Sequence, residues 1–201
     1  MYDVLIGEVR VADIQRPTEL KFLQVAPAHR DLVGAEIELV GMSRREFRLR
    51  DALMDAVSEF DYVIIDCPPS LGLLTLNALA AAHAVLIPLQ SEYYALEGLT
   101  ELTRTVEAVR AELNPQLQVE GIILTMFDPR NNLARQVATD VRQFFGGKVY
   151  ETVIPRNVRL SESPSHGKPI LLYDIESRGC QSYLALAREL ESRRTGQARS
   201  T

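Results

Sequence analysis

The chain has 201 residues, a formal net charge of −5, 46% hydrophobic residues and 24% charged residues. This composition is typical of a soluble globular protein, and the acidic balance excludes a wholly basic nucleic-acid coat while leaving room for a local basic patch. No stretch approaches the length of about 20 apolar residues that crosses a bilayer, and the N-terminus has no secretory signal pattern. Because Cys67 and Cys180 form no CxxC pair, we expect a reduced cytoplasmic protein.

The first third of the chain is predicted to contain two strands and one helix. Residues 21–26 have a strand pattern, and SRRE at 43–46 has the spacing of a capping box. The helix that would follow has its apolar face at Leu49, Leu53, Val57 and Phe60. The run YVIID at 62–66 is typical of a strand buried on both faces of a parallel sheet.

The middle of the chain continues this alternation. Residues 71–82 are predicted to form a helix and AVLIPLQ at 84–90 another buried strand. A long amphipathic pattern over 96–113 predicts a helix that ends at Asn114-Pro115. GIILTMFD at 121–128 predicts a third buried strand.

The last third is predicted to contain a helix, a strand, a short extended piece and a final helix. Asn132 is expected to cap a helix with an apolar face of Leu133, Val137, Val141 and Phe144. Residues 148–155 are predicted as a strand and 169–174 as extended chain, followed by a helix around 183–190. The polar residues 193–201 are expected to be a disordered tail.

Alternation of strands and helices predicts an α/β fold with a mostly parallel, twisted sheet and helices on both faces. The sequence shows no internal repeat and no linker, so residues 1–192 are predicted to form a single domain.

Asp66 is the first candidate functional residue. A carboxylate at the end of a buried strand lies where open α/β sheets place their ligands. The alternative is an aspartate that only caps the next helix. The pattern of this segment alone leaves both interpretations open.

Several catalytic and binding motifs are absent from the sequence. The three histidines, His29, His83 and His166, have no HExxH or HxH spacing, so a zinc site is not expected. The chain contains no GxSxG, no GxGxxG and no GxxxxGK[ST] sequence. Its two Gly-Lys pairs, at 147–148 and 167–168, are followed by valine and proline.

Four stretches together resemble the ParA/Soj ATPases of chromosome and plasmid partition, members of the deviant P-loop class that also includes MinD. They are DYVIIDCPPSLGLLTLNAL (61–79), LIPLQSEYYALEGL (86–99), EGIILTMFDPRNNLARQV (120–137) and VIPRNVRLSESPSHGKPILLYD (153–174). The resemblance extends from about Tyr2 to Leu190, and motifs of this length in this order are highly specific.

The resemblance assigns nucleotide-site roles to two segments. DCPP looks like the Walker B segment, which makes Asp66 the expected magnesium partner, and a hard divalent cation suits a carboxylate there. The following Cys67, Pro68 and Pro69 would be the switch that senses the γ-phosphate.

IPRN resembles the loop that packs on adenine in these proteins. It implies contacts from Pro155, Arg156 and Asn157. The alternative is an ordinary strand-to-helix loop in which Asn157 caps the helix.

The resemblance also implies non-specific DNA contacts. Arg130 and Arg159 match arginines that touch DNA in the ATP-bound dimers of this family, and Arg135, Arg156 and Lys168 are expected to add to the same surface. Such contacts go to phosphates, so they are independent of sequence and weakened by salt. The alternative is a set of solvated surface arginines.

The family's first unit, with its P-loop and signature lysine, has no counterpart before Tyr2 in this sequence. We therefore expect an N-terminally truncated P-loop NTPase-like fold, arising from a fragment or a misplaced start. The intact protein is expected to be a partitioning ATPase that uses ATP and Mg²⁺, forms a homodimer when ATP is bound, and binds double-stranded DNA. It would release DNA when a ParB-type partner stimulates hydrolysis, and it would be cytoplasmic and nucleoid-associated.

The alternative to this partitioning ATPase is a non-catalytic remnant that binds DNA or partners without ATP turnover. No membrane association is expected, because the tail TGQARST lacks the basic amphipathic helix of MinD-like regulators. An iron–sulfur reductase is disfavoured by the cysteine spacing.

Overall fold

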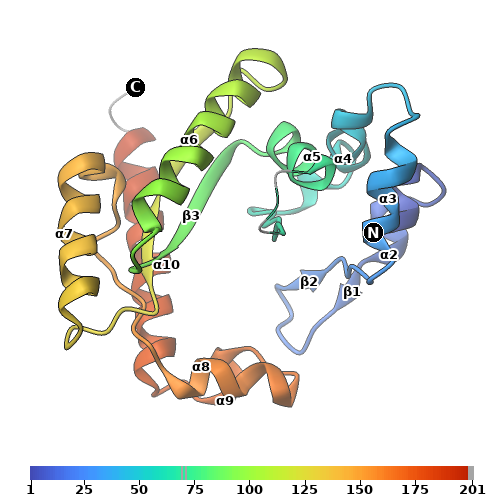
Figure 1. The fold of residues 1–201 in the computed structure, drawn as a ribbon. Coiled ribbons are helices and arrows are strands. Elements are labelled where there is room, and N and C mark those ends of the chain that lie inside the picture. The colour runs from blue at the N-terminus through green and yellow to red at the C-terminus, as the bar shows by residue number, and fades with distance from the viewer. Residues whose placement is uncertain (69, 71, 199–201) are drawn as a thin grey trace. The chain divides into compact units, whose positions relative to one another are not determined.

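The structure is a computed structural model that describes residues 1–68, 70 and 72–198. The chain divides into two compact units (Figure 1). Unit 1 comprises residues 1–85 and 104–118, and unit 2 comprises residues 86–103 and 119–201. The predicted single domain over 1–192 stays a prediction.

Unit 1 is mainly helical. Its α-helices are α1 (Tyr2–Ile6), α2 (Val11–Ile14), α3 (Leu32–Leu39), α4 (Arg48–Leu53) and α5 (Leu73–Ala81), with 3-10 turns at Arg45–Phe47 and Val57–Glu59. Leu5, Leu39, Leu49 and Ala78 belong to its buried core. Asn77 is also buried and accepts a hydrogen bond from the Leu49 N–H at 3.0 Å, so its amide is satisfied inside the core.

The predictions for the first third of the chain hold only in part. Only β2 (Gln24–Val25) forms within the strand predicted at 21–26, and it pairs antiparallel with β1 (Arg16–Pro17). The capping box predicted at 43–46 is wrong: Glu46 accepts a hydrogen bond from Arg45 Nε at 2.8 Å, and no side chain caps the 3-10 turn that follows. The predicted single helix is accordingly broken into α4 and two 3-10 turns.

The buried strand predicted at 62–66 is also wrong. Residues 62–68 have no strand assignment, and the Ile64 side chain is 90% exposed, although Ile65 packs against the core of unit 1. A strand needs a neighbour to receive its backbone hydrogen bonds. In the described chain the next strand, β3, pairs with β4 instead.

Unit 2 is built around β3 (Ala84–Gln90) and β4 (Gln118–Thr125), which are neighbours in one sheet (Figure 1). β3 has its predicted limits. The strand predicted at 121–128 is shifted toward the N-terminus, because Met126 has a left-handed φ of 51° that ends it.

Residues 149–155, part of the strand predicted at 148–155, extend alongside β4 and form two isolated parallel bridges to it, Ile122–Val149 and Phe127–Pro155. The helices together with this parallel pairing confirm the predicted α/β class.

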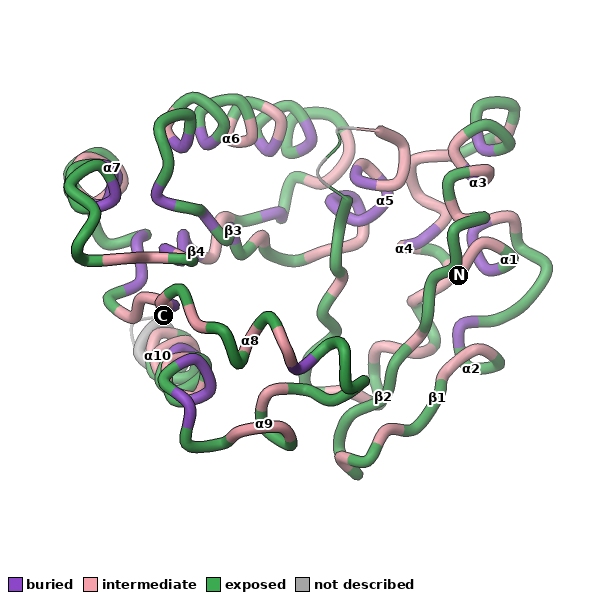
Figure 2. The backbone as a smooth tube through the Cα atoms, turned by 60° about the horizontal axis from the view of Figure 1, so that its bottom comes forward, coloured by how far each residue is buried: buried purple, intermediate pink, exposed green. Residues whose placement is uncertain are grey.

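The two amphipathic helices predicted over 96–113 and from residue 132 form, but the buried face of the second contains other residues than predicted. α6 (Ala95–Glu112) buries Leu99, Val106 and Val109. α7 (Asn132–Phe145) buries Ala134, Val137, Ala138 and Val141, on one side of the helix (Figure 2). The predicted face members Leu133 and Phe144 are 42% and 78% exposed, because the buried stripe includes the two alanines in their place.

The C-terminal part contains α8 (Val158–Glu162), α9 (Ile170–Tyr173) and α10 (Arg178–Ala198), with 3-10 turns at Gly146–Lys148 and Ser163–His166. The extended piece predicted at 169–174 is wrong, since residues after Pro169 form α9; proline tolerates this position because the first helical N–H groups need no partner inside the helix. α10 continues through residues 193–198, where we predicted a disordered tail, and residues 199–201 lie outside the described chain.

Hydrogen bonds of Glu189, which forms an ion pair with Arg193, connect α10 to the segment beside β4. The Glu189 carboxylate accepts hydrogen bonds from the backbone N–H groups of Glu151 and Thr152, at 2.9 Å each. The Arg193 guanidinium lies 4.0 Å over the buried Tyr150 ring and pairs with Glu189 at 2.7 Å. Burial favours a raised pKa for Glu189, but the hydrogen bonds from Thr152, Glu151 and Arg193 outweigh it and lower the pKa.

Gly121 allows β4 and Tyr150 to approach closely. A Cβ at position 121 would lie 2.5 Å from Tyr150 Cε2 and 2.8 Å from the Lys148 carbonyl oxygen, and that carbonyl is backbone. We predict that Gly121→Ala lowers the free energy of unfolding by about 1–3 kcal/mol through overpacking. The measurement is urea unfolding followed by circular dichroism.

Gly98→Ala is the matched control, because a Cβ at this helical position in α6 meets nothing within 4 Å. It should raise the free energy of unfolding by about 0.5–1 kcal/mol through helix propensity. Equal stability changes in the two variants would contradict the close approach.

Candidate functional site

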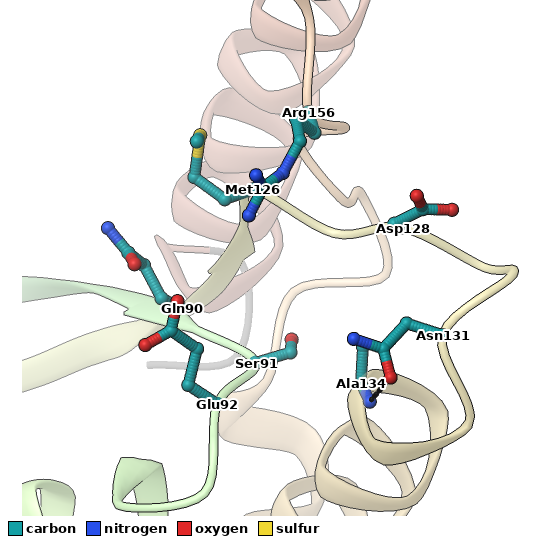
Figure 3. Close-up of a pocket in the computed structure, with 8 residues that line it drawn as sticks. All are labelled: Gln90, Ser91, Glu92, Met126, Asp128, Asn131, Ala134 and Arg156. Carbon is teal, nitrogen blue, oxygen red and sulfur yellow. Dashed lines mark hydrogen bonds between the residues drawn. The ribbon is translucent and has the colours of Figure 1, made fainter.

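A pocket of about 280 Å³ opens in unit 2 where β3 and β4 end (Figure 3). Ligands of open α/β sheets bind at this kind of edge. The lining residues are Gln90, Ser91, Glu92, Met126, Asp128, Asn131, Ala134 and Arg156. They come from the end of β3, the turn between β4 and α7, the first turn of α7, and the segment before α8.

Backbone hydrogen bonds bring Arg156 into this pocket. The Phe127 N–H donates to the Ile154 carbonyl at 3.1 Å, and the Arg156 N–H donates to the Phe127 carbonyl at 3.2 Å. The ladder therefore continues past the end of β4 and places Arg156 beside Met126 and Asp128. Residues from two distant parts of the sequence share one site for this reason.

Two buried polar atoms in this region have no hydrogen-bond partner among the residues that the structure describes. They are Ser91 Oγ, on a residue that is 7% exposed, and Asn157 Oδ1. The Ser91 hydroxyl points into the pocket (Figure 3). A buried polar group without a partner costs about 1–3 kcal/mol, so both atoms are suited to a hydrogen bond from a ligand.

The segment predicted to contact adenine lies at this edge of the sheet. Pro155 bridges to Phe127, and Arg156 lines the pocket. Asn157 stands at the N-cap position of α8, yet its side chain makes no capping hydrogen bond. The alternative interpretation of Asn157 as a helix cap is therefore wrong.

Arg130, predicted to contact DNA, is held by a carboxylate of the same turn. Its Nε and Nη2 donate to Asp128 Oδ1 and Oδ2 at 3.0 and 2.8 Å, and its backbone N–H donates to Asp128 Oδ1 at 3.0 Å. The hydrogen bonds from the Arg130 side chain and backbone lower the pKa of Asp128 to about 2. The same contact raises the pKa of Arg130.

Arg159, the second predicted DNA contact, is paired in a similar way. Its Nη1 lies 3.0 Å from Glu162 Oε2 and its Nε lies 3.2 Å from Asp174 Oδ2. Tyr173 donates a hydrogen bond to the same Glu162 oxygen at 3.2 Å. The hydrogen bond to Glu162 is the main cause of the raised pKa of Arg159.

The other predicted basic residues are exposed on separate elements. Arg135 lies on α7 and donates to the Asn132 side chain, and Lys168 follows the 3-10 turn at Ser163–His166. All five basic residues predicted to contact DNA belong to unit 2; they are Arg130, Arg135, Arg156, Arg159 and Lys168.

Asp66 lies in unit 1 on an exposed stretch without regular structure. α5 begins after Gly72 and has no side-chain cap, so the alternative of Asp66 as a helix cap is wrong. The exposed Cys67 lies with its thiol 3.8 Å from the Ile65 carbonyl, and reduced hydration of the thiolate, followed by the Asp66 charge, raises its pKa. Of the predicted switch residues, Pro68 is exposed and Pro69 lies outside the described residues.

Within the described ranges, no three His, Cys, Asp or Glu side chains converge as a metal site. In nucleotide sites, magnesium is bound by one or two carboxylates together with waters and phosphates, and the Asp66 carboxylate is exposed. No helix in the described part of the chain is long and apolar enough to cross a membrane.

The sequence prediction missed most of the pocket. Gln90 is the last residue of β3, and Ser91 and Glu92 directly follow this strand, so their position was itself a signal for ligand contact. The cap of α7 was assigned to Asn132, but Asn131 is the N-cap and accepts from the Leu133 N–H at 2.9 Å.

Comparisons with known proteins agree on one relationship. A family model described as an AAA domain matches residues 1–119. The chain is 62% identical over 195 residues to the chromosome partitioning protein ParA of Myxococcus xanthus, covering 97% of this chain and 69% of the relative. It is 56% identical over 190 residues to the sporulation initiation inhibitor protein Soj of Bacillus subtilis, covering 94% and 75%.

A solved structure is also similar. Cobyrinic acid a,c-diamide synthase of Mycobacterium smegmatis, with bound ATP analog and magnesium, has a TM-score of 0.72 and 36% identity. The match covers 83% of this chain and 73% of that one.

Substitution of Asn131 and of Asn132 tests which of the two residues caps α7. We predict that Asn131→Ala lowers the free energy of unfolding by about 1 kcal/mol, because two N–H groups at the start of α7 lose their acceptor. Asn132→Ala, in the first helical position, should change it by less than about 0.5 kcal/mol. Urea unfolding measures both, and a larger loss in Asn132→Ala would contradict the assignment.

Proposed function

The chain belongs to the ParA/Soj family of chromosome partitioning proteins, and from this relationship we propose that it acts as a partitioning ATPase that binds double-stranded DNA without sequence preference. ATP binding would form a homodimer that holds DNA, and a ParB-type partner would stimulate hydrolysis and release. The protein would work in the cytoplasm, on the nucleoid.

One observation carries the nucleotide part of this proposal: among the residues that the structure describes, Asn157 Oδ1 is buried without a hydrogen-bond partner, and the preceding residue, Arg156, lines the pocket. An amide oxygen in this state is suited to accept a hydrogen bond from the exocyclic amine of adenine. Pro155 would offer an apolar face to the base. The ATP analog and magnesium in the similar synthase support this assignment.

Asp66 would hold the magnesium ion of the nucleotide, in most such sites through water. The ion would supply charge neutralisation on the phosphates during hydrolysis. The sequence holds no GxxxxGK[ST] loop, so contacts to the triphosphate are not assigned to residues of this chain.

The DNA part of the proposal rests on Arg130 and Arg159, with Arg135 and Lys168 in support. All four are basic and accessible, and guanidinium groups bind phosphate oxygens well. Contacts of this kind do not discriminate between sequences. A net charge of −5 is compatible with this binding, because contacts to phosphates depend on local charge.

A second candidate is a protein that binds DNA or partners without ATP turnover. The two functions differ in one measurable property, which is magnesium-dependent ATP hydrolysis by the chain.

We expect charge reversal at Arg130 or Arg159 to abolish retention on non-specific duplex DNA at low salt, because an attractive phosphate contact becomes repulsive. Nucleotide binding should be unchanged. Gel retardation with Arg130→Glu and Arg159→Glu measures the effect. Arg188→Glu, an exposed arginine on α10, is the control for the change in net charge, and equal retention by all three variants would refute the DNA contacts.

Asp66→Ala should reduce magnesium-dependent ATP hydrolysis by about 10–100-fold, as expected for loss of a partner that orients a metal through water. Asp61→Ala, an exposed aspartate in the same segment, should retain the wild-type rate. A steady-state phosphate-release assay compares them. An unaltered rate in Asp66→Ala would remove the magnesium role, and no turnover by the wild-type chain would leave the remnant function.

A further inference from the structure

Both arginines proposed to bind DNA phosphates already have carboxylate partners within the chain. Arg130 pairs with Asp128, and Arg159 pairs with Glu162 and Asp174. A phosphate that approaches either guanidinium therefore meets a competing anion. This arrangement occurs on two different elements of unit 2, the turn after β4 and the helix α8.

The Asp128 carboxylate binds the Arg130 guanidinium with the same geometry that a DNA phosphate would use. The carboxylate accepts hydrogen bonds from Nε and Nη2 of the guanidinium. A phosphate binds arginine in the same bidentate arrangement. Arg130 itself is 88% exposed, whereas Asp128 is 28% exposed. The arginine is thus accessible to a ligand while its most favourable hydrogen-bonding edge is occupied.

Asp128 is fixed more firmly than its partner. Its Oδ1 accepts the backbone N–H of Arg130 at 3.0 Å, which anchors the carboxylate in the turn independently of the guanidinium. In Figure 3 the carboxylate is turned away from Asn131, another lining residue of the pocket. With its pKa lowered by Arg130, Asp128 keeps its negative charge at neutral pH.

We propose that Asp128 is an autoinhibitory residue of the DNA-contact surface: its carboxylate occupies the Arg130 guanidinium, and Arg130 engages a DNA phosphate only when this pair opens. The inference rests on the proposed DNA binding and adds a regulation of the same site. It gives the acidic residue of the FDPRN turn a function distinct from nucleotide contact.

The size of the effect follows from the exposure of the pair. Opening an exposed ion pair changes an equilibrium constant by a factor of about two to five. Asp128 therefore weakens DNA binding by a modest factor and does not block it. Removing the charge of Asp128 should release Arg130 and so strengthen DNA binding by about two- to fivefold.

Asp128→Asn is the direct test. Asparagine keeps an oxygen that can accept the Arg130 N–H, so the turn is retained while the charge on the guanidinium partner is removed. We expect Asp128→Asn to bind a non-specific duplex about two- to fivefold more tightly than Asp140→Asn. Asp140 lies on α7 and forms no ion pair with an arginine among the described residues. Its variant carries the same change in net charge as Asp128→Asn.

A double-mutant cycle separates release of Arg130 from a general gain of positive charge. In an Arg130→Ala background, Asp128→Asn should bind no better than Asp140→Asn. Fluorescence anisotropy with a labelled duplex at low salt measures all affinities. A gain from Asp128→Asn that persists without Arg130, or no gain over Asp140→Asn, would overturn the inference.

The two proposals fail in distinguishable ways. If the wild-type chain binds the duplex and Arg130→Ala weakens it, but Asp128→Asn equals Asp140→Asn, only the autoinhibitory role is refuted. If wild type and all variants fail to bind, DNA binding itself is refuted, and the role of Asp128 with it.

Discussion

The site depends on the parallel alignment of residues 149–156 with β4. Four backbone hydrogen bonds of 2.9–3.2 Å define this alignment. In the first, the Tyr150 N–H donates to the Ile122 carbonyl; in the last, the Arg156 N–H donates to the Phe127 carbonyl. Because these bonds fix both the register and the direction of the segment, they determine that Arg156 lies beside Met126 and Asp128. The hydrogen bonds of Glu189, which forms an ion pair with Arg193, hold the same segment against α10. The close approach at Gly121 allows it to pack against β4.

This alignment places opposite charges at short range. Asp128 and Arg156 line one pocket, and Asp128 also holds Arg130 of the same turn. Arg130 and Arg159, the two proposed DNA contacts, both belong to unit 2, and each is paired with at least one carboxylate of the chain.

Local patterns in the sequence predicted the elements that depend on their own residues. The limits of β3, the length of α6 and the presence of α7 followed from hydrophobic periodicity. The segment at 62–66 did not form a strand, because strand formation requires a partner that the sequence of that segment cannot specify. Asn157 and Arg156 were identified through a family resemblance. Ser91 follows a predicted strand and Asn131 precedes a predicted helix, but only the fold shows that both line one pocket with Arg156. The carboxylate partners of Arg130 and Arg159 lie within a few residues in two cases, but Asp174 is brought to Arg159 by the packing of α8 and α9.

The most direct test of the central claim is the equilibrium binding of the wild-type chain to two unrelated duplexes of equal length, across a range of salt concentrations with ATP and magnesium present. A partitioning protein that contacts phosphates should bind both duplexes with the same affinity, and the logarithm of the binding constant should fall linearly with the logarithm of salt concentration. No binding at low salt, or a preference for one duplex that salt does not weaken, would contradict the account.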